Sequence, residues 1–337
     1  MARPYGLLRA GFPYVKSLGM RRITNYPVDL ALGKEGRIFI LNRSEGAAQI
    51  RKYTVDDEDQ GNFGTVGDGE GELQWPVSII VDSEEMIFIS DEAHHNISSF
   101  NTDGEFQGAF GEFGSGDGQL NRPAGITFDA DENMLVVDSK NHRVQKFTKD
   151  GKFISTFGSF GDGDGQFDSP WGITVDELGD IYVADWRNDR VQKFNSDGEF
   201  VMKFGKSGSD NGEFNRPTDV AVDLDGDIYV CDRGNNRVQQ FNADAQYVDK
   251  FIGDATLSKI GRVYMMTNAS PNRIRDMSVL EPQKRLRQPR SISIDADGTL
   301  YITDTGSYRL QVYQKEAIHL EPHQFAPPMR SVTLHQE

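Results

Sequence analysis

The chain has 337 residues with a formal net charge of −16, and 37% of its residues are hydrophobic and 10% aromatic, which excludes a disordered chain. A single cysteine, Cys231, excludes an intramolecular disulfide and a thiolate metal site. The acidic balance argues against general nucleic-acid binding, which needs a large positive surface.

The first 27 residues carry five basic side chains and no acidic one, but no apolar run long enough for a signal peptide. No later segment is long and apolar enough to span a membrane. We therefore expect a cytoplasmic protein without membrane contact. Within this segment, FPYVKSLG at residues 12–19 has the alternation of a β-strand.

From residue 27 onward the sequence repeats. Each unit contains four short runs rich in Val, Ile, Tyr and Phe that are separated by Asp/Gly turns, as is typical of antiparallel strands. Four strands per unit predict an all-β fold, a six-bladed β-propeller of four-stranded antiparallel blades around a central channel. The units open at intervals of 49, 47, 47, 47 and 72 residues, at Pro27, Pro76, Pro123, Pro170, Pro217 and Pro289.

The two ends of the repeat region are expected to close the ring. The last unit has no fourth strand after RLQVY at residues 309–313, whereas residues 12–19 match the fourth-strand pattern EFVMKFG of residues 199–205. The N-terminal strand should therefore complete the sixth blade and remove an exposed sheet edge. The predicted single domain spans residues 12–317, and residues 318–337 are predicted to be an irregular tail.

The repeated pattern P-x-G-I-x-V-D, G-x-I-Y-V-x-D and N-x-R-V-Q-x-F resembles the NHL repeat, which is named for recurring Asn, His and Leu. Residues 123–147 and 170–194 follow it nearly throughout, whereas units one and two depart from it at Asn42, Gln49 and Asn96. The resemblance implies a stand-alone six-bladed propeller. Proteins that resemble this fold include binding modules as well as lyases or hydrolases with a metal in the channel.

An acid and a base recur at fixed spacing after the second strand, as Asp138 with Arg143 and Asp185 with Arg190. The same pair in four blades indicates a scaffold role rather than four active sites. We expect the pairs to fix the loop between the second and third strands or to join neighbouring blades. These loops and the glycine-rich acidic loops between blades share one side of the disc, here called the loop face.

The third residue of each first strand should line the channel mouth. The resemblance implies glycine there, and Asp29 and Asp219 depart from it. With His94 or His95, these carboxylates are candidates to hold a divalent metal such as calcium or zinc, or to act as a catalytic acid/base pair. The alternative is that each caps a neighbouring loop amide. The six positions are Asp29, Ser78, Gly125, Gly172, Asp219 and Ser291.

The loop that follows the second strand varies between units, and its residues are candidates for ligand binding. Aromatic and basic side chains that converge on a funnel suit an anionic or aromatic ligand. Adjacent histidines on an extended segment point to opposite sides, so at most one of the two should face the funnel. The candidates are Arg43, His94, His95, Trp186, Arg187, Arg233 and Tyr308.

Residues 254–288 form an insertion between blades five and six. Residues 254–268 predict a short helix that Asp254 caps and that SPN at 270–272 ends. We expect the insertion on the loop face, as a lid, as a partner-binding element or as a brace over an exposed blade edge. It is basic, as are residues 1–27, so the disc should carry one basic sector that would also allow self-association.

Two functions remain open from the sequence. The first is a binding scaffold for a protein or an anionic small molecule on the loop face, supported by the regular repeat. The alternative is a metal-assisted lyase or hydrolase with its site at the mouth of the channel, although the sequence has no linear Ser-His-Asp, Cys-His or H-E-x-x-H motif.

Overall fold

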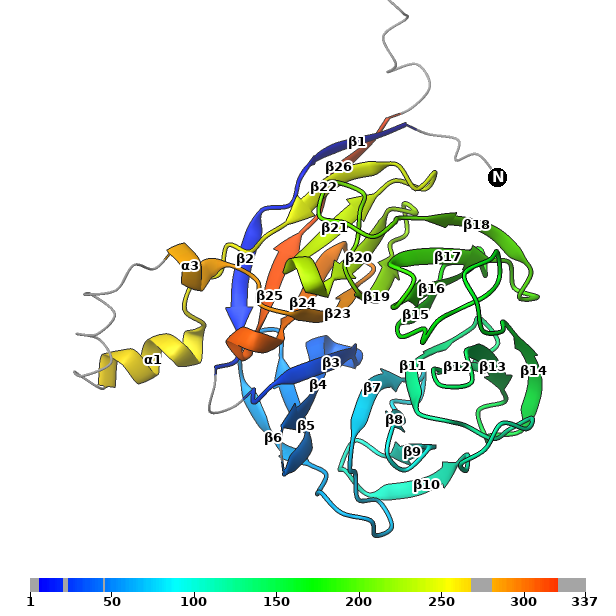
Figure 1. Cartoon of the computed structure of the whole chain (residues 1–337). Helices are drawn as coiled ribbons and strands as arrows, with labels where there is room; N and C mark the ends of the chain where they lie inside the picture. The colour runs from blue at the N-terminus through cyan, green and yellow to red at the C-terminus, as the bar shows by residue number, and fades with distance from the viewer. Residues whose placement is uncertain (1–5, 21–23, 45, 268–280, 321–337) are drawn as a thin grey trace, which may run out of the picture.

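The computed structural model describes residues 6–20, 24–44, 46–267 and 281–320. Six four-stranded antiparallel sheets surround a central axis, which confirms the predicted six-bladed propeller (Figure 1). The innermost strands of the six blades, in order, are β3 (Pro27–Leu32), β7 (Pro76–Val81), β11 (Pro123–Phe128), β15 (Ile173–Val175), β19 (Pro217–Val222) and β23 (Pro289–Ile294).

The second strand of each blade is almost wholly buried, because neighbouring blades cover both faces of the sheet. These strands are β4 (Arg37–Ser44), β8 (Ile87–Asp91), β12 (Met134–Asp138), β16 (Ile181–Asp185), β20 (Ile228–Asp232) and β24 (Thr299–Asp304). The third strands are β5 (Ala47–Thr54), β9 (Asn96–Phe100), β13 (Arg143–Phe147), β17 (Arg190–Phe194), β21 (Arg237–Phe241) and β25 (Arg309–Gln314). Blades one to five end with β6 (Asp59–Phe63), β10 (Phe106–Phe110), β14 (Phe153–Phe157), β18 (Phe200–Phe204) and β22 (Tyr247–Phe251).

The N-terminal strand closes the ring as predicted. β2 (Tyr14–Leu18) pairs antiparallel with β25, with Tyr14 opposite Tyr313 and Leu18 opposite Leu310, and so supplies the fourth strand of blade six. The buried Leu18 packs with Leu30 and Ile38 of blade one, so this strand also contributes to the contact between the last blade and the first.

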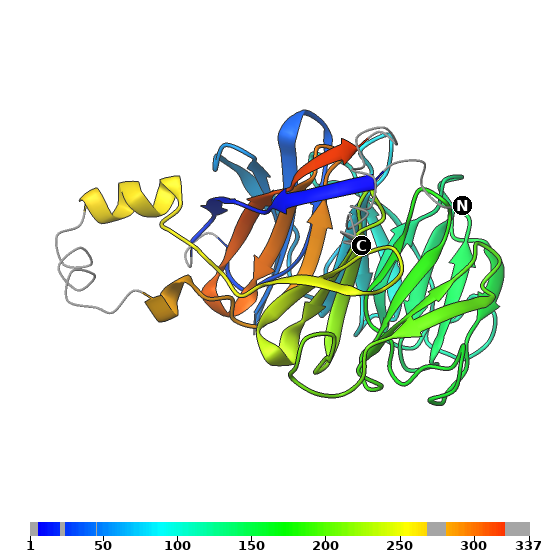
Figure 2. The same cartoon turned by 90° about the horizontal axis from the view of Figure 1, so that it is seen from above.

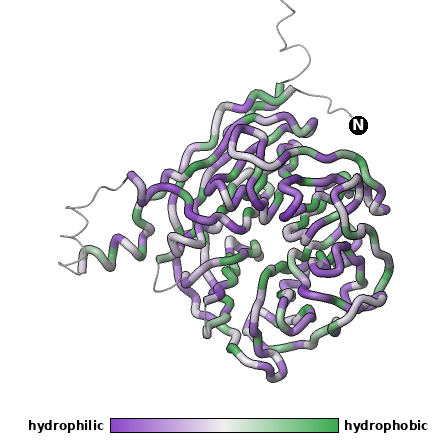
Figure 3. Tube along the Cα trace, viewed as in Figure 1, coloured by the Kyte–Doolittle hydropathy of each residue, from purple (hydrophilic) through white to green (hydrophobic). Residues whose placement is uncertain are grey.

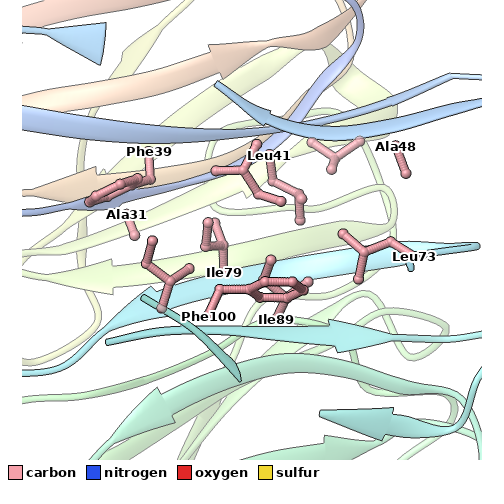
Figure 4. Packing of buried hydrophobic residues seen from close by; sticks show 11 residues of the cluster. Ala31, Phe39, Leu41, Ala48, Leu73, Ile79, Ile89 and Phe100 are labelled. Atoms are coloured by element: carbon pink, nitrogen blue, oxygen red, sulfur yellow. The ribbon is translucent and has the colours of Figure 1, made fainter. Parts of the chain in front are cut away.

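The core lies between blades. Phe39 and Leu41 of blade one face Ile79, Ile89 and Phe100 of blade two, and all five side chains are buried (Figure 4). Hydrophobic and hydrophilic stretches therefore follow one another at short intervals along the chain (Figure 3). Each blade is stabilised by its neighbours on both sides, which is why closure of the ring matters.

One prediction about the tail is wrong. β26 (Glu316–Leu320) pairs antiparallel with β1 (Gly6–Gly11) in a two-stranded sheet outside the blades, so residues 318–320 are not irregular (Figure 2). Buried ion pairs that the sequence pattern does not reveal anchor both strands, because Arg9 and Lys315 contact Asp227 of blade five. Residues 321–337 lie outside the described residues.

The insertion contains the expected helix, but its cap differs from the prediction. α1 (Lys259–Thr267) is capped by Ser258, whose Oγ accepts the N–H of Gly261 at 3.0 Å. Asp254 does not cap the helix, since it lies one turn too early and its own N–H donates to Gln311 Oε1 at 3.2 Å. The predicted stop at residues 270–272 lies outside the described residues, and a second helix, α3 (Glu281–Lys284), follows.

Residues 254–267 of the insertion lie at the outer rim rather than beside the funnel, whereas Gln288 at its other end contacts Arg233 and Asn236 of the loop face. Asp57 of blade one accepts the N–H of Ile260 at 2.9 Å, and the N–H of Thr256 donates to Tyr14 of β2 at 3.0 Å. Figure 1 shows α1 beyond β2, on the outside of the disc. These residues brace the edge strand of blade six and do not form the predicted lid.

The remaining short elements are the 3-10 turns η1 (Lys34–Gly36), η2 (Arg233–Asn235) and η3 (Thr305–Ser307). None of the helices in the described ranges is long and apolar enough to cross a membrane.

Candidate functional site at the channel mouth

The repeated acid and base fix the loops of the loop face. In blade four, Arg190 donates to Asp185 at 2.8 Å and to the carbonyls of Gly163 and Gln166 in the preceding interblade loop, at 2.9 and 2.7 Å. Asp185 accepts the N–H of Asp168 in the same loop at 2.9 Å. The same ion pair recurs as Arg143–Asp138, Arg237–Asp232 and Arg309–Asp304. These pairs are therefore structural, as expected.

At the third position of the first strands, two blades need glycine and two use aspartate. A Cβ atom at Gly125 would lie 2.6 Å from the carbonyl oxygen of Trp171, and one at Gly172 would lie 2.6 Å from Asp219 Cα. The backbones of blades three, four and five thus approach too closely here for any side chain on these two glycines.

Asp29 and Asp219 join neighbouring blades through their carboxylates. Asp29 accepts the N–H of Ile79 in blade two at 2.8 Å and the hydroxyl of Ser291 in blade six. Asp219 accepts the N–H of Ile292 in blade six at 2.9 Å. The alternative interpretation, in which these aspartates cap neighbouring amides, describes these contacts, although the amides belong to strands rather than to loops.

The same two aspartates form an electrostatically coupled pair inside the channel. Removal from water raises the pKa of Asp29. Burial also raises the pKa of Asp219 well above its usual range, and the charge of Asp29 raises it further. Two carboxyl groups that line one narrow channel do not ionise independently, so we expect the pair to retain a proton more readily than two separate aspartates.

A pocket of about 500 Å³ opens on the loop face beside the channel, between blades one, two and six. Arg43 lies with its guanidinium 4.5 Å from the ring centre of Trp75, and its Nη1 donates to the carbonyl of Pro76 at 3.0 Å. Tyr26 and Tyr308 close the opposite side, with ring centres 4.8 Å apart. The lining residues are Asn25, Tyr26, Val28, Arg43, Ser44, Trp75, Arg290, Thr305 and Tyr308.

Arg43 and Arg290 line this mouth, and Arg233 lies close enough for its charge to act on both. Burial, together with the charges of Arg43 and Arg233, lowers the pKa of Arg290 to about 9. Burial likewise lowers the pKa of Arg43 to about 10. Within the described ranges none of the three forms an ion pair with a carboxylate, and the Nε atoms of Arg233 and Arg290 are buried without a hydrogen-bond partner.

The mouth continues into the channel through a narrow neck. Val28 and Arg290 line both the pocket and a neck of about 20 Å³, which the six third-position residues surround. Below the neck, Asp29 and Asp219 also line a cavity of about 300 Å³ that the inner strands of the blades enclose. The order along the axis is therefore a basic mouth, a neck with two carboxyl groups, and a wider chamber.

The two predicted histidines do not meet the aspartate pair. His94 Nε2 lies 3.2 Å from Asp68 Oδ1, and His95 Nδ1 accepts the N–H of Arg122 at 3.0 Å. In the described part of the chain, no group of three or more His, Cys, Asp or Glu residues could hold a metal ion. The four predicted metal ligands are thus not brought together.

The remaining predicted residues lie in a second cluster, over blade four. The guanidinium groups of Arg187 and Arg216 lie 5.8 and 5.2 Å from the ring centre of Trp186, and the ring centre of Trp171 is 6.1 Å away. Arg233 lies between this cluster and the mouth, since the charge of Arg216 contributes to lowering its pKa after burial, and its own charge contributes to lowering the pKa values of Arg43 and Arg290.

Of the residues that line the mouth, only Arg43 and Tyr308 were singled out from the sequence, and Arg290 and Trp75 are among those that were not. Arg290 directly follows the opening proline of unit six, where the other units have Val28, Val77, Ala124, Trp171 and Thr218. Trp75 directly precedes the opening proline of unit two. Because these two residues depart from the repeat, the sequence could have indicated them as candidate site residues. Their proximity depends on ring closure, which places blade six beside blade one.

Comparisons with known proteins agree with this architecture. The family model described as NHL repeat matches residues 120–147, 167–194, 214–241 and 286–313, which fall in blades three to six. The chain is a six-bladed β-propeller with NHL repeats at four positions, in blades three to six. Blades one and two, which depart from the pattern in sequence, lie outside the matched segments.

Solved structures share the fold at low sequence identity. A streptogramin B lyase has a TM-score of 0.57 at 11% identity, with 93% of this chain and 98% of that chain covered. The WD40 propeller domain of Doa1 has a TM-score of 0.57 at 9% identity, with 91% and 98% covered. A virginiamycin B lyase from Staphylococcus aureus has a TM-score of 0.56 at 12% identity, with 92% and 99% covered. A search of curated proteins gives no match.

Proposed function

We propose that this propeller binds an anionic small molecule at the loop-face mouth of its channel. The observation that carries the proposal is that Arg43 and Arg290 line one pocket, with Arg233 nearby, and that among the described residues no ion pair joins any of the three to a carboxylate. Like charges that are brought together and partly removed from water destabilise a folded protein unless an anion neutralises them. A ligand carboxylate or phosphate would supply that charge and accept from guanidinium N–H groups.

The rest of the pocket suits the body of a small ligand. A volume of about 500 Å³ lies within the usual range for small-molecule sites. Trp75, Tyr26 and Tyr308 offer aromatic surface, and Asn25 and Ser44 offer polar groups at the same opening. Aromatic walls with a few polar groups are the usual lining of a site that orients a compact organic molecule.

The alternative, a metal-assisted lyase or hydrolase, stays a prediction. The lyases that share this fold do so at identities of 11% and 12%, which is similarity of architecture alone. No described contact favours a metal at this mouth over an organic anion.

The test is calorimetric titration with benzoate, citrate and inorganic phosphate. We expect at least one of them to bind and Arg290→Gln to weaken its affinity about tenfold or more, because a hydrogen bond to a charged group contributes about 1.5–3 kcal/mol. The control is Arg51→Gln, which removes an arginine of blade one that is paired with Asp59 at 2.8 Å.

Thermal unfolding separates binding from folding. Loss of Arg290 should leave the unfolding midpoint unchanged or raise it, since it relieves repulsion with Arg43 and Arg233. Equal affinity in wild type and Arg290→Gln, or no binding of any of the three anions, would contradict the proposal.

A further inference from the structure

The charges along the channel change sign over a short distance. Arg290 lines both the basic mouth and the neck, and Asp29 and Asp219 line that same neck. No ion pair joins Arg290 to either aspartate among the described contacts. A ligand held by the arginines therefore has two carboxyl groups directly ahead of it on the channel axis.

The neck has room for one small polar group. Its volume of about 20 Å³ holds roughly one water-sized group. A carboxylate has about four lone-pair sites. Asp219 accepts from the backbone N–H groups of Val220 and Ile292, and Asp29 accepts from those of Leu30 and Ile79 and from the hydroxyl of Ser291. The pair thus keeps capacity to accept hydrogen bonds from a donor that enters the neck.

A primary ammonium group matches these properties better than the other candidates. It is similar in size to water, it carries three N–H donors, and its positive charge offsets the repulsion between Asp29 and Asp219. A second anionic group would add to that repulsion. A methyl group would cover the carboxyl oxygens without donating to them, at a cost in desolvation.

We infer that the ligand is a zwitterion whose acidic group meets the arginines at the mouth and whose primary ammonium group enters the neck and donates to Asp219 and Asp29. The inference rests on the proposed function, because it assumes that the arginines hold an anion. It names the class of ligand: a compact molecule with one carboxylate or phosphate group and one amino group.

Binding of such a ligand should release a proton. An ammonium group beside the pair favours the ionised form of both carboxyl groups, so the proton that they share passes to solvent. The other titratable groups nearby are Cys231, opposite Asp219 on β20, and Asp232. Burial and the charges of Asp219 and Asp29 raise the pKa of the Cys231 thiol, so it remains protonated and does not supply the proton near neutral pH.

The experiment compares butyrate with 2-, 3- and 4-aminobutyrate, which add an ammonium group at three distances from the same carboxylate. Titrations are run in two buffers with different ionisation enthalpies, which reports the protons released. We expect at least one amino derivative to bind about tenfold or more tightly than butyrate and to release a proton on binding. In Asp219→Asn the advantage over butyrate should be lost, while the affinity for butyrate itself is not weakened.

The outcomes separate this inference from the proposed function. If butyrate binds in an Arg290-dependent manner but no amino derivative binds more tightly, the zwitterion is excluded and the anion site stands. If the advantage persists in Asp219→Asn, the ammonium group does not enter the neck and the inference is wrong. If butyrate, its amino derivatives, benzoate, citrate and phosphate all fail to bind, both proposals fall. The wild-type comparison decides the matter even where the Asp219 variant does not fold.

Discussion

Asp219 combines a structural contact with an unfavourable position for its charge. Its carboxylate accepts the N–H of Ile292 in the next blade at 2.9 Å, and it also faces the channel together with Asp29. The hydrogen bonds favour the ionised carboxylate, whereas burial and the neighbouring carboxyl group favour the protonated form, and the balance raises its pKa.

This balance predicts how Asp219→Asn changes the pH dependence of stability. Because the folded-state pKa is raised, the stabilisation from protonated Asp219 is fully present below the unfolded pKa of about 3.9 and is lost as pH rises through the folded pKa. Asparagine stays neutral. The free energy of unfolding of the variant, relative to that of wild type, should therefore increase as pH rises from 4. Urea unfolding at a series of pH values up to 9 measures this difference.

The matched control is Asp164→Asn, whose carboxylate is exposed in an ion pair with Lys203. The difference in free energy of unfolding between Asp164→Asn and wild type should vary far less with pH. Parallel pH curves for wild type and Asp219→Asn would show that Asp219 has an ordinary pKa in the folded protein.

The sequence singled out Asp29 and Asp219 correctly, but it did not reveal which groups they contact. Asp29 and Asp219 stood out because they occupy positions where glycine is expected. Their partners, Ile79 and Ile292, are neighbours only after folding, since each lies in the next blade. Arg290, two residues beyond the insertion, was not recognised as part of the mouth.

The element that recurs most strictly is the clamp between the second and third strands and the preceding loop. Arg190 and Asp185 are almost wholly buried, with side-chain exposures of 7% and 0%. Arg190 also donates to three carbonyls of the preceding loop, those of Asp162, Gly163 and Gln166. Phe167 of the same loop is buried in the core between blades, so hydrogen bonds and packing together hold the loop in place. In blade six the clamp of Arg309 and Asp304 lies next to Thr305 and Tyr308, which line the mouth.

Arg190→Ala should therefore be strongly destabilising. It leaves the buried carboxylate of Asp185 without its counter-charge, and loss of one partner of a buried pair typically costs about 3–5 kcal/mol. Denaturant unfolding measures the loss. Lys203→Ala removes one partner of an exposed pair, with exposures of 45% and 57%, and should have a much smaller effect. Similar losses for the two variants would show that the clamp does not stabilise the fold.

For the insertion, the sequence predicted the helix but not its position in the fold. Its sequence predicted a helix, and α1 is present. The expectation of a lid assumed that a segment joining two blades stays near their connection. Instead, Asp57 of blade one accepts the N–H of Ile260 and draws the helix to the outer rim, a contact across about 200 residues of sequence that no local pattern encodes.

For the whole molecule, closure by β2 is the step on which the other contacts depend. Without it, β25 becomes an open edge strand, and the buried Leu18 no longer packs against blade one. Each blade is stabilised by its neighbours, so an opening between blades six and one should weaken the ring as a whole.

Deletion of residues 1–19 should thus lower the unfolding midpoint and cause aggregation, as measured by thermal unfolding and by size-exclusion chromatography with light scattering. Deletion of residues 1–11 is the control, because it removes β1 and the Arg9–Asp227 ion pair but leaves β2 and the Lys315–Asp227 ion pair in place. A monomeric protein with an unchanged midpoint after removal of residues 1–19 would be incompatible with closure by β2.

The sequence by itself determined the number of blades, the four strands of each and the strand that closes the ring. It could do so because these features depend on local alternation and on a period that repeats along the chain. Only the tertiary structure decided that Arg43 and Arg290 share one mouth with Arg233 nearby, that two aspartates share one neck, and that β1 pairs with β26. The physical reason is that these groups come from distant blades, and their charges interact only once the closed ring brings them within a few ångströms and removes the water between them.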